Sequence, residues 1–302
     1  MVASCFSPTS VYECYLRRCF SAAGLSSQRT SIDNETTIHF WGPKPNRSSA
    51  NKPSLLLIHG FGPVSLWQWH PQVHFLSSHF HLYVPDLIFF GDSTTDSFER
   101  SEIFQAKSIS KLMDKLGVVR YSIIGTSYGG FVAYHMAAMW PERVDKVVVA
   151  SSAINKTRHD NAELVKRAGV ENIDDLLLPE TTEQLRTLLR LVLFRRRVFL
   201  PDCLLNDILN NLYKKNKDRK SELLRGITFG RDGHHANITP LCQDVLLVWG
   251  DHDQIFPYEK AFGLKELLGA KTRMEVIKNT GHAPQLEKPK EFNNIVGKFL
   301  CG

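Results

Sequence analysis

Short apolar runs alternate with helix-like segments through the first half of the chain. The run at residues 54–60 is continuous, as in a strand buried on both faces of a sheet, and residues 80–86 look similar. Further strands are predicted at residues 118–125 and 145–152. Between them, apolar side chains recur at helical spacing in residues 103–116 and crowd together in residues 128–140. Residues 36–41 instead alternate apolar and polar side chains, as a half-buried edge strand does. This order predicts an α/β fold with a mostly parallel central sheet flanked by helices.

The pattern changes near residue 155 and returns near residue 240. Residues 155–239 hold leucine-rich helical segments and no clear strand-like run. Strand patterns resume at residues 244–250 and 273–279. Because strands lie on both sides of the helical stretch, we expect one core domain, residues 32–154 and 240–302. Residues 155–239 are then a helical cap inserted into that core.

Residues 1–31 are predicted to form an N-terminal amphipathic helix or extension. Tyr12, Leu16 and Phe20 recur at helical spacing, so one apolar face could dock on a folded domain. The same segment is rich in serine and arginine and holds a single acidic residue, Glu13, as transit peptides do. We expect the docked helix, with targeting to an organelle as the alternative.

Composition is that of an ordinary globular chain of 302 residues with a formal net charge of +6. No zinc-ligand spacing, repeat or aromatic stacking platform accompanies this charge, which argues against a nucleic-acid partner. The basic residues do concentrate in residues 186–225, with eleven Lys or Arg against four Asp or Glu. A solvated helical surface is the simpler interpretation, and peripheral contact with an anionic membrane through this basic cap is the alternative.

The six cysteines show no paired metal-ligand spacing and are expected to be reduced thiols. The N-terminus lacks the apolar run of a secretory signal, and no run approaches the ~18 residues of a membrane span. We therefore expect a cytoplasmic protein. The oligomeric state stays open.

One pentapeptide carries the chemistry expected of this chain. Gly125-Thr126-Ser127-Tyr128-Gly129 lies between a predicted strand and a predicted buried helix. A serine at such a tight turn is held in strained backbone angles and is exposed at the carboxyl edge of the sheet. The pentapeptide predicts a nucleophile, Ser127, against the simpler possibility of a glycine-lined strand end.

A serine nucleophile needs a base, and the base needs an acid to orient it. Asp251 and Asp253 follow the strand at residues 244–250, and His282 follows the strand at residues 273–279. The order Ser, Asp, His places every member just past a strand, where open α/β sheets bind ligands. Spacing alone leaves Asp251 and Asp253 both open as the acid.

His282 stands out among the twelve histidines because it follows a strand, a glycine and both candidate acids. His59 precedes the pentapeptide in the chain, and His135 lies inside the predicted buried helix. His234 and His235 lack the further ligands that a metal site would need, so no metal site is expected.

The segment His59-Gly60-Phe61-Gly62 follows another predicted strand. Its turn would direct the Phe61 amide toward the serine, where it would form an oxyanion hole with the amide of Tyr128. Glycines that only shape a turn are the structural alternative.

These motifs together resemble the α/β-hydrolase fold superfamily. The stretches that carry the resemblance are LLLIHGFG, VPDLIFFGDS, IIGTSYGGFVAY, LLVWGDHDQIFP and NTGHAPQLEKP. They look like plant members with a helical cap, related to monoacylglycerol-lipase-like and C–C hydrolase-like enzymes. The family pattern W-G-x-x-D-x-x-x-P falls on Trp249, Gly250, Asp253 and Pro257, and so implies Asp253 as the acid.

The resemblance implies a serine carboxylic-ester hydrolase with the triad Ser127, Asp253 and His282 and no cofactor. Where relatives have a small Pro-Gly turn, this chain has Phe89 and Phe90, which favours small apolar or aromatic esters. The side chains expected to line the pocket, unless they only pack the core, are Trp67, Trp69, Phe89 and Leu193.

Two other functions fit the same triad. Plant hormone receptors of this fold hydrolyse their small-molecule ligand slowly, and turnover would distinguish them. A C–C bond hydrolase or lyase would convert a vinylogous diketone or a cyanohydrin and leave simple aryl esters untouched.

Overall fold

The computed structural model describes residues 7–44, 52–194, 200–231 and 238–302. Its centre is a nine-stranded sheet in the order β1-β2-β4-β3-β6-β7-β8-β9, with β5 paired to β2. The strands are β1 (Leu25–Ser31), β2 (Thr36–Pro43), β3 (Ser54–Ile58), β4 (His81–Pro85), β5 (Thr94–Thr95), β6 (Tyr121–Thr126), β7 (Val144–Ala150), β8 (Asp244–Gly250) and β9 (Thr272–Ile277). All neighbours from β4 to β9 pair in parallel, which confirms the mostly parallel sheet predicted from the apolar runs.

The edge of the sheet differs from the prediction. Residues 36–41 were expected at the edge, but β2 lies inside, between β1 and β4, and is buried along most of its length. The edge strand is β1, which belongs to the segment expected as an N-terminal extension. Its sequence LSSQRTS is almost entirely polar, so it gives no apolar signal, and only pairing with β2 makes it a strand.

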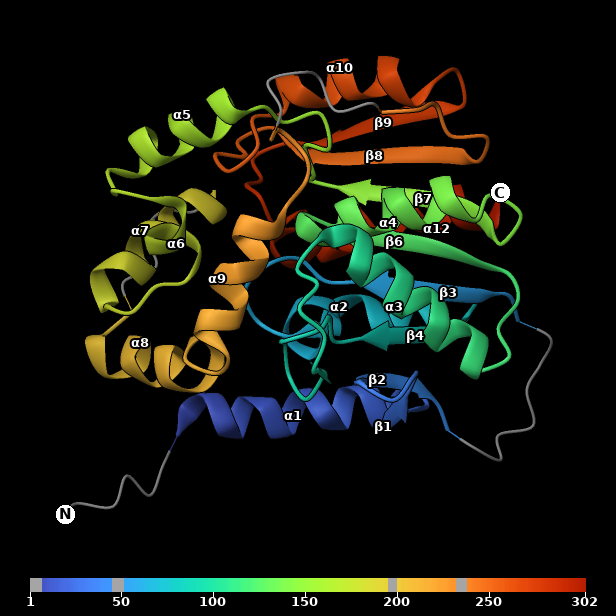
Figure 1. Ribbon diagram of the computed structural model, residues 1–302, viewed down its shortest axis with the longest axis horizontal. Helices are drawn as coiled ribbons and strands as arrows, with labels where there is room; N and C mark the ends of the chain where they lie inside the picture. Colours follow the sequence, from blue (N-terminus) through green and yellow to red (C-terminus); the bar gives the residue numbers. More distant parts are fainter. Residues whose placement is uncertain (1–6, 45–51, 195–199, 232–237) are drawn as a thin grey trace.

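Helices cover both faces of the sheet (Figure 1). Buried side chains of α3, α4 and α10 pack in one hydrophobic cluster, and those of α1, α2 and α12 in the other. The helices of the core are α1 (Pro8–Ala22), α2 (Ser65–Leu76), α3 (Glu102–Lys115), α4 (Tyr128–Met139), α10 (Glu259–Leu268), α11 (Pro284–Glu287) and α12 (Pro289–Cys301).

The N-terminal helix α1 is docked on the core. Leu16 and Phe20 are fully buried, and the Phe20 ring packs 5.1 Å from the ring of Trp41 on β2. Tyr15, on the opposite face of α1, is 56% exposed. Leu16 and Phe20 therefore pack as expected for a docked helix, while Tyr12 of the same predicted face stays 39% exposed.

A third cluster of buried side chains belongs to the cap, between β7 and β8. The cap elements gather beside one end of the sheet, on the left of Figure 1. They are α5 (Arg158–Ala168), α6 (Ile173–Leu177), α7 (Thr182–Val192), α8 (Asp202–Ile208), the π-helical turn η1 (Leu209–Tyr213) and α9 (Lys217–Gly226). Ile255 of the core domain packs into this cluster, so the cap is packed against the core.

Many basic residues of the cap are engaged in ion pairs. The pairs in the described part of the window are Arg186–Asp202, Lys215–Asp92, Lys217–Glu180, Arg219–Glu222 and Arg225–Asp174. Exposed pairs of this kind are typical of a solvated helical surface. Residues 195–197, three arginines of the same window, lie outside the described residues. Contact of the cap with a membrane therefore stays a prediction.

Over the part of the chain that the structure describes, no helix is both long and apolar enough to cross a membrane.

Replacing Phe20 with alanine should lower the free energy of unfolding by about 3–5 kcal/mol, because it leaves a cavity between α1 and the sheet. Tyr15→Ala, on the exposed face of the same helix, should change it by less than about 0.5 kcal/mol. Denaturant unfolding followed by circular dichroism measures both. Equal stability of the two variants would contradict the docking of α1.

Candidate active site

Ser127 occupies the turn between β6 and α4 with φ of 51° and ψ of −122°, a backbone conformation that side chains rarely adopt. Close backbone approach on either side requires glycine. A Cβ on Gly125 would lie 2.3 Å from the Gly129 carbonyl oxygen, and one on Gly129 would lie 2.3 Å from the Ile58 carbonyl oxygen. The glycines of the pentapeptide thus allow a turn tight enough to hold the serine between strand and helix.

The structure brings Ser127, His282 and Asp253 into one hydrogen-bonded line. The His282 Nε2 atom lies 2.9 Å from the Ser127 Oγ atom. The His282 Nδ1 atom lies 2.9 Å and 3.0 Å from the two carboxylate oxygens of Asp253. Since a carboxylate only accepts, Nδ1 carries the proton, and Nε2 is left to accept the serine hydroxyl proton.

The carboxylate of Asp253 is fixed by the turn that follows β8. It is 5% exposed and accepts hydrogen bonds from the amides of Ile255 and Phe256, both at 2.9 Å. These bonds orient its second oxygen toward the imidazole. A buried, multiply hydrogen-bonded carboxylate is suited to hold a histidine in one tautomer.

Asp251 has a different task. Its carboxylate accepts from the amide of Thr280 at 3.3 Å and lies 2.7 Å from Nδ1 of the exposed His252. These contacts keep the pKa of Asp251 below its ordinary value, against the opposing effect of partial burial. Asp251 therefore joins the turn after β8 to the turn that carries His282. The choice that spacing left open is made by geometry, and Asp253 faces the histidine.

The glycine-rich turn after β3 lies directly against the nucleophile. A Cβ on Gly60 would be 2.9 Å from the Ser127 Cβ atom. Gln68, on α2, holds this turn by accepting from the Gly60 amide at 2.9 Å and donating to the Gly60 carbonyl at 3.1 Å. The pattern of glycines alone did not reveal Gln68, because it acts only when α2 folds back over the turn.

His59 helps to hold the same turn through a hydrogen bond to the segment after β4. It is fully buried, and its Nε2 atom accepts from the Leu87 amide at 2.9 Å. Burial lowers the pKa of His59, so the ring is held neutral and serves as a structural acceptor.

Within the described residues, the amides of Phe61 and Tyr128 have no hydrogen-bond partner. The Tyr128 amide is at the first turn of α4, where backbone N–H groups lack helical acceptors. The two rings pack edge to face with centroids 5.9 Å apart, so the two residues are neighbours. Both amides are available to stabilise negative charge on an oxygen beside Ser127.

A cavity of about 340 Å³ opens at Ser127 and His282 beneath the cap. Trp67 and Leu193 line it, as expected. Phe131 and Phe256 also contribute to the wall, the latter with its ring 5.6 Å from the His282 ring. These two were missed because, in the sequence, they are indistinguishable from ordinary core residues.

Two of the expected pocket residues are not in this wall. Trp69 is fully buried in the core between α1, α2 and the sheet. It lies two positions after Trp67 on α2, so the two side chains point to different faces of the helix. Phe89 is 5% exposed and belongs to the hydrophobic cluster on the other face of the sheet, in a turn where its φ is 73°. The Arg100 Cζ atom lies 4.7 Å from the centroid of the Phe89 ring. The expectation is wrong for Trp69 and Phe89.

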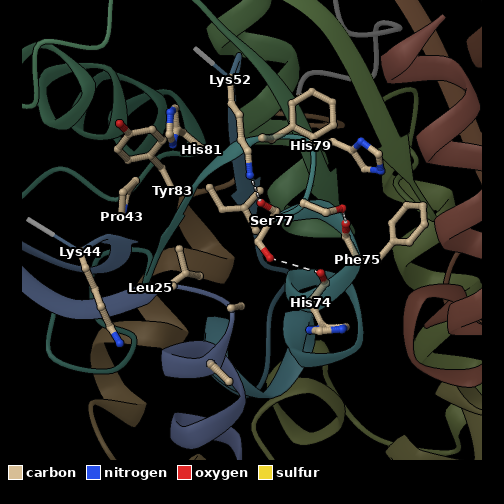
Figure 2. A pocket seen from close by; sticks show the side chains of 16 residues that line it. Leu25, Pro43, Lys44, Lys52, His74, Phe75, Ser77, His79, His81 and Tyr83 are labelled. Carbon is tan, nitrogen blue, oxygen red and sulfur yellow. Dashed lines mark hydrogen bonds between the residues drawn. The ribbon is translucent and has the colours of Figure 1, made fainter. Parts of the chain in front are cut away.

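A larger hollow of about 820 Å³ lies at the other edge of the sheet, where β3 and β4 begin (Figure 2). Figure 2 shows it lined by His74, His79 and Tyr83, with the Lys52 ammonium donating to the Ser77 carbonyl at 2.8 Å. None of the triad residues reaches it, because they follow the carboxyl ends of the strands. The candidate active site is therefore the smaller cavity, which Ser127 and His282 line.

A sequence profile of the alpha/beta hydrolase fold matches residues 53–289. The chain belongs to the alpha/beta hydrolase fold family. The match includes the nucleophile turn, the cap and both later strand ends.

Relatives of two kinds resemble this hydrolase-family chain over most of its length. Monoacylglycerol lipase abhd6-B from Xenopus laevis is 26% identical over 302 residues, covering 96% of this chain and 86% of the relative. A 2-hydroxy-6-oxononadienedioate/2-hydroxy-6-oxononatrienedioate hydrolase from Pseudomonas sp is 26% identical over 256 residues, covering 82% of this chain and 87% of the relative. The crystal structure of a membrane phospholipase A, a bacterial virulence factor, superposes with a TM-score of 0.81 at 24% identity, covering 97% of this chain and 90% of that one. Family and relatives support hydrolase activity.

Replacing Asp253 with asparagine should slow labelling of Ser127 by a fluorophosphonate about 10³- to 10⁴-fold, because the histidine loses the acceptor that sets its tautomer. Asp251→Asn is the matched control and should have a much smaller effect, since its carboxylate holds only the turn. Labelling reactions quenched at successive times give the labelling rate constant of each variant. A slower reaction of the Asp251 variant would reverse the assignment.

Proposed function

We propose that this protein is a serine carboxylic-ester hydrolase. The observation that carries the proposal is the hydrogen-bonded line Ser127–His282–Asp253, which ends at the mouth of an apolar cavity. Each residue follows the end of a different parallel strand or its turn, so the sheet itself sets their spacing. This is the arrangement that acyl transfer through a serine requires.

In the first half of the reaction, Ser127 Oγ attacks the ester carbonyl and His282 Nε2 takes the hydroxyl proton. Asp253 stabilises the imidazolium that forms. The amides of Phe61 and Tyr128 donate to the oxyanion of the tetrahedral intermediate, a contribution typically worth several kcal/mol. His282 then gives its proton to the leaving alcohol, and an acyl-enzyme on Ser127 remains.

In the second half, His282 takes a proton from water, and the resulting hydroxide attacks the acyl-enzyme. The same two amides stabilise the second oxyanion. Collapse of this intermediate releases the carboxylic acid and restores the Ser127 hydroxyl. Every proton passes through His282, and the reaction uses only side chains and amides of this chain.

The cavity supports small apolar or aromatic esters as substrates. Its volume of about 340 Å³ is near the lower limit of cavities for drug-sized ligands. The wall consists mainly of aromatic and aliphatic side chains, among them Phe61, Trp67, Phe131, Phe256 and leucines of the cap.

A C–C bond hydrolase is the second candidate, and the Pseudomonas relative named above supports it. In that reaction the same triad and oxyanion hole would act on a vinylogous diketone. The two candidates differ in what the cavity selects and not in the residues at its mouth.

Replacing Ser127 with alanine should lower kcat/KM on aryl and alkyl esters by at least about 10³-fold, because the nucleophile is lost. Ser78→Ala, an exposed serine at the opposite edge of the sheet, is the control and should leave the rate unchanged. Release of 4-nitrophenol from short-chain esters gives both rates. Full activity of the Ser127 variant would refute the proposed mechanism.

A substrate panel separates the two candidates. We expect turnover of 4-nitrophenyl butyrate, benzyl esters and short monoacylglycerols by the unmodified protein, with slow or no conversion of a dienoate vinylogous diketone. Spectrophotometric assays follow all of them. Conversion of the diketone with all esters left untouched would favour the C–C hydrolase.

A further inference from the structure

Lys156 places a buried ammonium in the wall of the catalytic cavity. It lies at the start of the cap, between β7 and α5, and is only 6% exposed. Its Nζ atom donates to the side-chain oxygen of Asn161 at 3.3 Å and lies 5.8 Å from the centroid of the Phe131 ring. Since an ammonium has three protons to donate, one long hydrogen bond leaves most of its capacity unused.

No carboxylate in the described residues lies within ion-pair distance of the Lys156 ammonium. The nearby Asp160 is held by Lys260 at 2.7 Å and by its capping bonds to Thr157. Glu102 acts on Lys156 only through space, because its oxygens accept from the amide and hydroxyl of Thr228. A buried charge without a partner is costly, which makes Lys156 a poor choice for a purely structural role.

Burial lowers the pKa of Lys156 to about 8, and Glu102 and Asp160 oppose the shift. The amine therefore keeps its proton through most of the neutral range. The cavity thus contains a cation at neutral pH.

Tyr128 contributes to the same wall. Its ring packs 6.0 Å from Phe131, the residue that Lys156 also contacts. The Tyr128 hydroxyl is buried and has no hydrogen-bond partner among the described residues. Glu102 acts electrostatically on both Lys156 and Tyr128, which places the two in one neighbourhood. Because the Tyr128 hydroxyl is covered by neighbouring atoms, it belongs to the packing around Phe131. Lys156 contributes the ammonium group to this wall.

We propose, on the basis of the ester-hydrolase function above, that Lys156 is a specificity residue that binds a carboxylate on the substrate. The substrate class is then an ester that carries a free carboxylate at some distance from the reacting carbonyl. Charge-assisted hydrogen bonds are about twice as strong as neutral ones, so a carboxylate gains more here than a hydroxyl does. The bound anion supplies the counterion that the protein does not.

The test compares carboxylate esters with uncharged substrates of the same shape. Monomethyl glutarate is paired with methyl 5-methylhexanoate, which places the charge on the acyl side. The second pair, 4-acetoxybenzoate and 4-isopropylphenyl acetate, places it on the alcohol side. In one of the two pairs, the protein should show a higher kcat/KM for the carboxylate. A pair of hydroxyl-bearing esters of equal length shows whether charge or hydrogen bonding is recognised.

Lys156→Met keeps the length of the side chain and removes the charge. In this variant the ratio of kcat/KM for the carboxylate over its neutral partner should fall about 10- to 100-fold, mainly through KM. Lys220→Met is the matched control, because Lys220 is equally buried, has a pKa lowered to about 8, and lies outside the cavity wall. Its ratio should equal that of the unmodified protein. Lys156→Gln serves in the same way if the methionine variant does not fold.

Fluorophosphonate labelling reports on the triad in every variant, and so separates the two possible failures. If the unmodified protein hydrolyses the neutral esters but shows no preference for either carboxylate, the role of Lys156 is refuted and the ester-hydrolase function stands. An unchanged ratio in a labelled Lys156→Met protein refutes that role as well. A preference for the hydroxyl-bearing esters over the carboxylates also overturns it. Absence of both labelling and ester turnover refutes the ester-hydrolase function itself.

Discussion

The backbone of Ser127, held at φ of 51° between β6 and α4, is the constraint on which the rest of the site depends. Such a conformation is strained and persists only where surrounding structure enforces it. Enforcement comes from β3 and α4, whose backbones approach so closely that Gly125 and Gly129 have no room for a side chain. The same approach brings the glycine turn after β3 against Ser127, and so sets the proposed nucleophile and the proposed oxyanion hole together.

The sheet and the cap have different roles in the proposed function: the sheet positions the triad, and the cap helps to form the substrate cavity. The sheet, packed on both faces, fixes Ser127, Asp253 and His282 at its carboxyl edge with little freedom. The cap has its own small hydrophobic cluster and meets the core through Ile255 and Phe256. The cavity lies where the two meet, so its walls come from segments distant in the chain. Lys156 lies at the junction between the sheet and the cap, shortly after β7.

Much of the site followed from strand ends. Continuous apolar runs predicted the parallel strands, and polar residues after them predicted Ser127 and His282, because parallel strands end at one edge. The acid was different: Asp251 and Asp253 both follow β8, and the motif of the resembling family, not spacing, favoured Asp253. Hydrogen bonds from the Ile255 and Phe256 amides show why, since they turn the Asp253 carboxylate toward the imidazole.

The sequence by itself determined the fold family, the mostly parallel sheet and the residues of the proposed triad, because these depend on local periodicity and short motifs. Only the tertiary structure decided what surrounds that triad. Trp67 and Trp69 look alike in sequence, yet one lines the cavity and the other lies in the core, since helical rotation and packing against α1 separate them. Likewise, β1 is the edge strand only because it pairs with β2. Lys156 is buried without a carboxylate partner among the described residues only because the cap packs against the core around it. The burial of a side chain depends on which distant segments pack against it, so the local sequence does not predict it.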